Sequence, residues 1–148
     1  MVNKGLWYPN TLVFLQFSSL FFIMFWGNLF TDNMFLLGIQ FFAVFLGLWA
    51  IYTMRIGNFN ITPIPVKNAI LIENGPYSLI RHPMYLSIFL FVIPEVISGF
   101  SYLRLLAFLI LIVTIVFKVR YEEKLLQIKL EAYSDYMKRS FRVIPFLY

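Results

Sequence analysis

Long apolar runs constrain this chain more than any other feature of its sequence. Of its 148 residues, 61% are hydrophobic, 18 are phenylalanine and only 13% are charged. A water-soluble domain of this length exposes much of its surface and cannot bury so many apolar side chains. The sequence therefore predicts an integral membrane protein that folds as a single domain over residues 1–148.

Four of these runs are long enough to cross a hydrocarbon core about 30 Å thick, which takes roughly 20 helical residues. They cover residues 12–30, 34–54, 83–100 and 103–119. Each run must be a helix, because an open strand would leave its backbone groups unpaired in lipid. We therefore expect an all-α fold, a bundle of four transmembrane helices.

The positive charges predict which side of the membrane each segment faces. Eleven of the twelve Lys and Arg residues precede the first run, lie between the second and third, or lie at the end of the fourth and beyond it. Only Arg104 lies on the opposite side. By the positive-inside rule, both termini face the cytoplasm. Residues 55–82 and 120–148 would then form one cytoplasmic cap over the bundle.

Composition also limits the partners and the chemistry. The chain has no cysteine, which excludes disulfides, thiolate metal sites and a cysteine nucleophile. One histidine is too few for a histidine metal centre, so we expect no metal. The net charge of +5 lies in the segments predicted to face the cytoplasm, the C-terminal tail among them, where anionic lipid headgroups are a sufficient partner. We therefore expect a membrane partner and no nucleic acid.

A polar segment, residues 75–85, lies where the third run begins. It contains the only histidine, His82, next to Arg81. Pro83 suits the first turn of a helix, whose free N–H groups would then face an anion such as a carboxylate or phosphate. Arg81 either adds a charge for the same anion or anchors the helix at the headgroups, and the residues alone favour neither.

Two adjacent acids, Glu122 and Glu123, follow the fourth run on a helix that we expect to project into the cap. In one interpretation they form surface ion pairs with Lys118 and Arg120. In the other, a carboxylate faces the hydroxyl groups or the cationic centre of a cofactor. Spacing alone does not decide between the two.

Glu95 is the one acid inside an apolar run. An acid at that depth is costly in lipid and is a functional candidate by default. It lies near the outer end of its run, however, where it can reach the headgroups or Arg104. We therefore expect a structural role for it.

Taken together, these residues resemble the isoprenylcysteine carboxyl methyltransferase family and the related phospholipid N-methyltransferases. That family has a Gly-x-Tyr-x-x-x-Arg-His-Pro-x-Tyr segment before a membrane helix and a Glu-Glu pair after the last span. A Tyr-x-x-Tyr tail that ends near Arg-x-x-Pro follows. In this chain the matching residues are 75–85, 122–123, 133–136 and 142–145.

The resemblance implies a membrane methyltransferase without a Rossmann domain. It would use S-adenosylmethionine and act on a lipid or lipid-like carboxylate or amine at the cytoplasmic face. The cofactor's carboxylate suits the helix start, its ribose suits a glutamate, and aromatic faces attract its sulfonium. The implied catalytic residues are Arg81, His82 and Glu122. The implied cofactor-binding residues are Tyr77, His82, Tyr85, Glu122, Glu123, Tyr133 and Tyr136.

Two other functions fit parts of the sequence. Membrane sterol and enoyl reductases carry a similar Arg-His-Pro-x-Tyr segment and use NADPH, but they are longer and usually have Asn where this chain has Met84. A non-enzymatic membrane scaffold with a basic, lipid-binding tail would explain the charge asymmetry. A scaffold leaves the order and spacing of the polar residues unexplained.

Overall fold

The computed structural model describes residues 5, 7–26, 29–55, 58 and 60–145. Within this part of the chain the expected all-α class is confirmed, because the only β-type pairing is one isolated bridge, between Ile80 and Phe141. The helices are α1 (Trp7–Phe25), α2 (Met34–Met54), the 3-10 turn η1 (Gly75–Ser78), α3 (Pro83–Ser98), α4 (Tyr102–Lys129) and α5 (Tyr133–Arg139).

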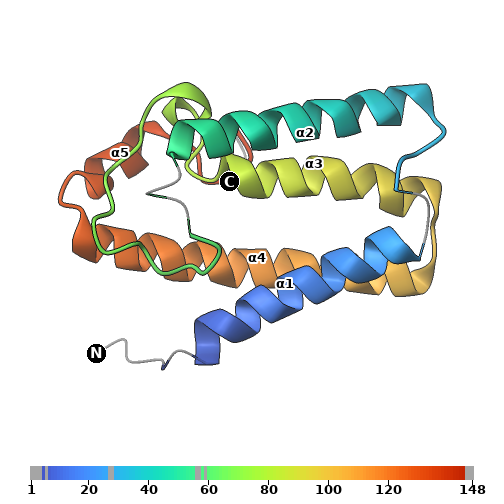
Figure 1. The fold of residues 1–148 in the computed structure, drawn as a ribbon, viewed down its shortest axis with the longest axis horizontal. Helices are drawn as coiled ribbons and strands as arrows, with labels where there is room; N and C mark the ends of the chain where they lie inside the picture. The colour runs from blue at the N-terminus through green and yellow to red at the C-terminus, as the bar shows by residue number, and fades with distance from the viewer. Residues whose placement is uncertain (1–4, 6, 27–28, 56–57, 59, 146–148) are drawn as a thin grey trace.

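The four long helices form two pairs (Figure 1). α2 lies along α3, and α1 crosses α4. Small residues allow the first pair to approach closely, since a Cβ added at Gly47 of α2 would lie 3.0 Å from the hydroxyl of Ser87 on α3. The hydrophobic core between the pairs consists of Ile23, Val92, Val96, Ala107, Leu111, Ile115, Val119 and Val143.

Polarity is distributed as expected for a protein dissolved in lipid. Large apolar side chains such as Phe14, Phe42 and Phe45 are exposed, whereas Gln40 and Thr114 are buried. Polar groups in membrane helices face the bundle interior because lipid offers them no partner. Three helices, α1, α2 and α4, are long and apolar enough to cross a membrane.

Two helices depart from their predicted bounds. α3 ends at Ser98 and has 16 residues, which span about 24 Å at 1.5 Å per residue, less than a core of about 30 Å. The fourth span therefore stays a prediction. α1 runs over Trp7–Phe25 instead of 12–30. The earlier start is compatible with Pro9, because Pro9 lies in the first turn, where backbone N–H groups form no hydrogen bond within the helix. Residues 27 and 28 of the predicted run lie outside the described residues.

The remaining segments gather at the end of the bundle where α2 ends and α3 begins (Figure 1). α4 continues past its apolar part to Lys129, as predicted, and α5 follows it at the same end of the bundle. Backbone hydrogen bonds attach the C-terminal segment to the start of α3. Arg81 N donates to Phe141 O at 2.8 Å, His82 N to Arg142 O at 3.0 Å, and Phe141 N to Leu79 O at 2.9 Å.

Gly75 fixes η1 against α2. Its φ of +57° lies in the left-handed region, which favours glycine. A Cβ at this position would lie 2.8 Å from Thr53 Oγ1. The glycine therefore allows the contact that places Tyr77, and the segment leading to Arg81, beside the end of α2.

A polar cluster joins all four long helices at the opposite end of the bundle. Arg104 donates to Ile23 O at 2.7 Å and to Gly99 O at 2.8 Å, and its Nη2 lies 3.4 Å from Glu95 Oε2. Gln40 donates to the other Glu95 oxygen at 2.9 Å. Of the two partners considered for Glu95, the structure thus confirms Arg104.

Candidate active site

A cavity of about 420 Å³ lies between the bundle and the segments at the α5 end. Pockets for cofactors and small ligands typically measure about 300–1,000 Å³. All four long helices, residue 58, the loop over residues 60–72 and α5 contribute to its walls. Of the eight predicted site residues, seven line this cavity: Tyr77, Arg81, His82, Tyr85, Glu122, Tyr133 and Tyr136.

The start of α3 brings His82 and Tyr85 into the cavity wall. His82 caps the helix and Pro83 occupies its first turn, as predicted. The His82 ring stacks on Tyr85, with centroids 5.6 Å apart. Tyr85 OH donates to Glu122 Oε2 at 3.1 Å, which connects α3 to α4 across the cavity.

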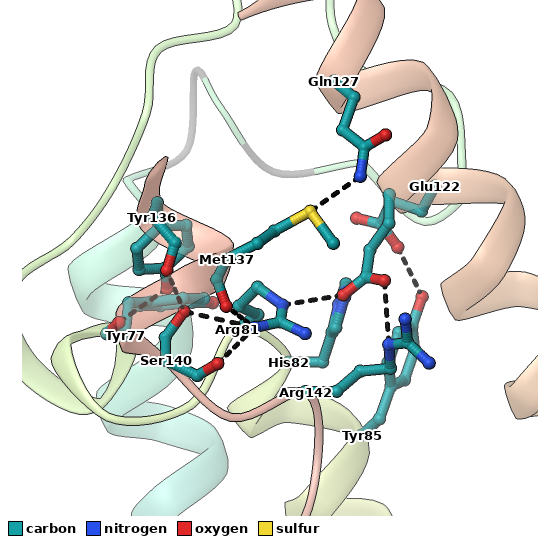
Figure 2. A network of polar contacts seen from close by, with 11 residues as sticks. Tyr77, Arg81, His82, Tyr85, Glu122, Gln127, Tyr136, Met137, Ser140 and Arg142 are labelled. Atoms are coloured by element: carbon teal, nitrogen blue, oxygen red, sulfur yellow. Dashed lines mark hydrogen bonds and ion pairs between the residues drawn. The ribbon is translucent and has the colours of Figure 1, made fainter. Parts of the chain in front are cut away.

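Glu123 is the centre of a buried ion cluster next to the cavity. Its three partners, Arg81, His82 and Arg142, are labelled in Figure 2. Glu123 is 3% exposed. Its Oε1 accepts from Arg81 Nε at 2.8 Å, and its Oε2 lies 2.8 Å from Arg142 Nε. His82 Nε2 lies 3.4 Å from Oε1. Three basic groups therefore converge on one carboxylate that does not itself line the cavity.

Arg81 is directed into the protein and not at the membrane surface. Its side chain is 7% exposed. Besides Glu123, it donates to the backbone carbonyls of Met137 at 3.1 Å and of Ser140. The guanidinium thus fixes the end of α5 and the following turn to the start of α3.

Glu122 is the acid of the pair that faces the cavity. The alternative of surface ion pairs with Lys118 and Arg120 is wrong for the described residues, because Glu122 binds Tyr85 and Glu123 binds arginines from other segments. Lys118 instead donates to Gln16 on α1 at 2.6 Å.

Three buried tyrosines, Tyr77, Tyr133 and Tyr136, form the wall on the η1 and α5 side. Burial, with the charge of Glu122 nearby, raises the pKa of Tyr77, and burial, with the charges of Glu123 and Glu122, raises the pKa of Tyr133. Burial raises the pKa of Tyr136 to about 12. All three hydroxyls are therefore neutral donors at physiological pH. Tyr136 OH donates to Tyr77 O at 2.6 Å. Tyr77 OH is buried and has no partner among the described residues.

Several cavity residues were missed by sequence reasoning. Lys118 and Gln16 form a contact between positions 102 residues apart, which no local pattern predicts. A polar Gln16 inside an apolar run was the available signal. Asn58 uses both amide atoms, each at 3.0 Å, to bind the backbone of Ile70, and so holds the loop that covers the cavity.

The model of the isoprenylcysteine carboxyl methyltransferase family matches residues 35–128, more than half of the chain. This chain belongs to that family. Members of the isoprenylcysteine carboxyl methyltransferase family are membrane methyltransferases, in agreement with the apolar helices. The family match includes the segment at the start of α3 and the pair Glu122-Glu123, whereas α5 lies beyond it. A comparison with curated proteins gives no match.

Proposed function

We propose that this protein transfers the methyl group of S-adenosylmethionine to a lipid-like acceptor at the cytoplasmic membrane face. The observation that carries the proposal is the unpartnered Tyr77 hydroxyl, which is buried in the wall of a cavity of cofactor size that Glu122 also lines. A buried donor without a partner is unfavourable, so a ligand that accepts its hydrogen bond gains affinity there.

The cofactor end of the cavity, defined by Tyr77, Tyr85, Glu122, Tyr133 and Tyr136, suits the groups of S-adenosylmethionine. Glu122 offers a carboxylate for the ribose hydroxyls, and the tyrosine faces offer negative potential for the sulfonium. Tyr77 offers a donor for an acceptor atom of the same molecule. The cofactor supplies a methyl group already activated by a positively charged sulfur.

The acceptor end of the cavity, defined by Phe17, Leu20, Ile51, Met84 and Ile88, is apolar and is formed by α1, α2 and α3. An alkyl chain is stabilised there by about 0.8 kcal/mol for each buried CH₂ group. The two ends together fit a reaction between a polar cofactor and a hydrophobic acceptor.

The protein's own residues contribute mainly by positioning the reactants and excluding water. The loop over residues 60–72 and α5 cover the cavity, and Asn58 holds the loop in place. A carboxylate acceptor is ionised at neutral pH and needs no base, whereas His82 is placed to accept a proton from an amine acceptor. Arg81 acts through Glu123 and the C-terminal segment and is therefore a positioning residue.

Calorimetric titration of S-adenosylhomocysteine into the detergent-purified protein and its variants tests the proposal. Glu122→Gln should weaken binding about 10- to 100-fold, since a hydrogen bond to a charged group contributes about 1.5–3 kcal/mol. Tyr77→Phe should weaken it about 2- to 10-fold. Glu131→Gln, at an exposed position, is the control. Wild-type affinity in both site variants would contradict the assignment.

A further inference from the structure

The proposed function leaves one charged side chain of the cavity wall without a role. Lys118 of α4 lines the cavity and is 2% exposed. Its Nζ donates to Gln16 Oε1 on α1 at 2.6 Å and lies 5.5 Å from the centre of the Tyr85 ring on α3. An aromatic face attracts a cation within about 6 Å of the ring centre. Two other helices therefore fix the position of this ammonium group.

Glu122 supplies the negative charge that acts on Lys118. It follows Lys118 by about one turn of α4, and the two charges interact. They form no direct ion pair among the contacts of the described residues, and Glu122 Oε2 instead accepts from Tyr85 OH at 3.1 Å. Tyr85 thus faces the cation with its ring and binds the carboxylate with its hydroxyl.

This arrangement ties a carboxylate of the cavity to a cation that cannot move away. Opposite charges attract one another more strongly in a site with little water than in bulk water. Lys118 is held by Gln16, so its attraction draws the Glu122 carboxylate in one fixed direction, while Tyr85 holds one of the carboxylate oxygens. Glu122 is therefore presented to the cavity in a defined orientation before any ligand binds.

We propose that Lys118 and Gln16 are positioning residues, which fix the Glu122 carboxylate in the orientation that binds the cofactor's ribose hydroxyls. The inference rests on the proposed function, because its ligand is the cofactor. It also extends the site to α1, which lies outside the family match over residues 35–128. The alternative is a purely structural Lys118, which joins α1 to α4 without an effect on the carboxylate.

A double-mutant cycle separates the two roles, because residues that act through one another have non-additive effects. Calorimetry measures the affinity of the whole chain, in detergent, for S-adenosylhomocysteine. Lys118→Met should weaken binding about 3- to 30-fold when Glu122 is present. In the Glu122→Gln background the same replacement should change the affinity less than about twofold. An equal factor in both backgrounds, or wild-type affinity in Lys118→Met, would overturn the proposal.

Lys124→Met is the matched control. Lys124 lies on the same helix at an exposed position outside the cavity wall. This replacement removes the same charge and should change the affinity less than about twofold in either background. The comparison shows that the position of the charge matters and not the net charge of the protein.

Gln16→Glu carries the test if Lys118→Met does not fold, because it keeps the size of the side chain and places a second carboxylate beside the ammonium group. The new acid competes with Glu122 for Lys118, so the affinity for S-adenosylhomocysteine should fall about 3- to 10-fold. The fall should be absent in the Glu122→Gln background. A purely structural Lys118 predicts a stronger link between α1 and α4 with unchanged affinity, and that result would overturn the proposal.

Chemical rescue tests whether the charge itself is required. The chain has no cysteine, so a thiol introduced by Lys118→Cys is the one thiol that can be modified. Labelling with 2-aminoethyl methanethiosulfonate restores an ammonium group and should recover at least about threefold in affinity, whereas the neutral methyl methanethiosulfonate should recover none. Equal affinity with the two reagents, in protein whose labelling is verified by mass spectrometry, would overturn the proposal.

These outcomes are distinct from a failure of the proposed function. If wild type does not bind S-adenosylhomocysteine, the proposed function is wrong and the inference falls with it. If wild type binds the compound, and Lys118→Met and Gln16→Glu bind it equally well, the proposed function is unaffected and only the inference is wrong.

Discussion

Replacing Glu123 with glutamine tests whether the ion cluster holds the C-terminal segment over the cavity. The amide would leave the guanidinium groups of Arg81 and Arg142 without their negative partner. The Arg81 pair dominates, since its side chains are 7% and 4% exposed. Removing one partner of a buried pair costs about 3–5 kcal/mol. The Arg142 side chain is 26% exposed, so its pair contributes about 1 kcal/mol or less.

Backbone hydrogen bonds would then hold the segment together with the bonds from Arg81 to the carbonyls of Met137 and Ser140 and from Tyr136 OH to Tyr77 O. The three bonds between residues 79–82 and 141–142 contribute about 0.5–1.5 kcal/mol each. The three backbone bonds together contribute about 1.5–4.5 kcal/mol, so a loss of about 3 kcal/mol or more is comparable to their whole contribution. Since 1.4 kcal/mol is a factor of ten, the population in which the segment is detached should rise by about two to three orders of magnitude.

Hydrogen exchange followed by mass spectrometry measures this opening. In Glu123→Gln, peptides covering residues 130–145 should exchange about 100- to 1,000-fold faster, while peptides from α2 keep their rates. Glu131→Gln removes an exposed acid beside the same segment and serves as the control. An acceleration below about tenfold would refute the conclusion that this cluster anchors the C-terminal segment.

Three further predictions concern stability. Gly75→Ala should lower the unfolding midpoint in detergent, because a left-handed backbone costs a non-glycine residue about 1–2 kcal/mol and the added Cβ would meet Thr53 of α2. Gly38→Ala is the control, since no atom lies within 4 Å of its added Cβ, and it should raise the unfolding midpoint. Arg104→Met should destabilise the bundle by about 3–5 kcal/mol by leaving Glu95 unpaired, and adding Glu95→Gln should recover part of the lost midpoint. Burial raises the pKa of the Tyr136 hydroxyl from 10.0 to about 12, so the stability that the neutral hydroxyl contributes is complete below pH 10 and is lost as pH rises towards 12. The difference in absorbance at 295 nm between wild type and Tyr136→Phe should therefore titrate with a midpoint near pH 12. A midpoint near pH 10 would contradict burial of this hydroxyl.

The helices were predictable where local chemistry marks their ends. α2 has its predicted bounds because Asn33 caps it, accepting from the N–H groups of Phe35 and Leu36. Pro83 marks the start of α3 in the same way. Hydropathy alone placed α1 wrongly, since it follows composition and does not detect that Trp7 to Asn10 already have helical geometry.

The members of the site were predictable, but most of their partners were not. Of the eight predicted site residues, seven line one cavity, and only Glu123 lies outside its wall. Spacing along one helix could not decide which glutamate faces the cavity, because the decision depends on Tyr85 and Arg81, which come from another segment. The contact between Lys118 and Gln16 depends on how α1 crosses α4, and that crossing is a property of packing.

Titration of the wild-type protein with S-adenosylmethionine, S-adenosylhomocysteine and NADPH tests the central claim most directly. The account predicts saturable binding of the first two compounds, with one site per chain, and no binding of NADPH. Binding of NADPH alone would contradict it and place the chain with the membrane reductases. Absence of binding by all three, in protein shown to be folded, would contradict the assignment of this cavity as a cofactor site.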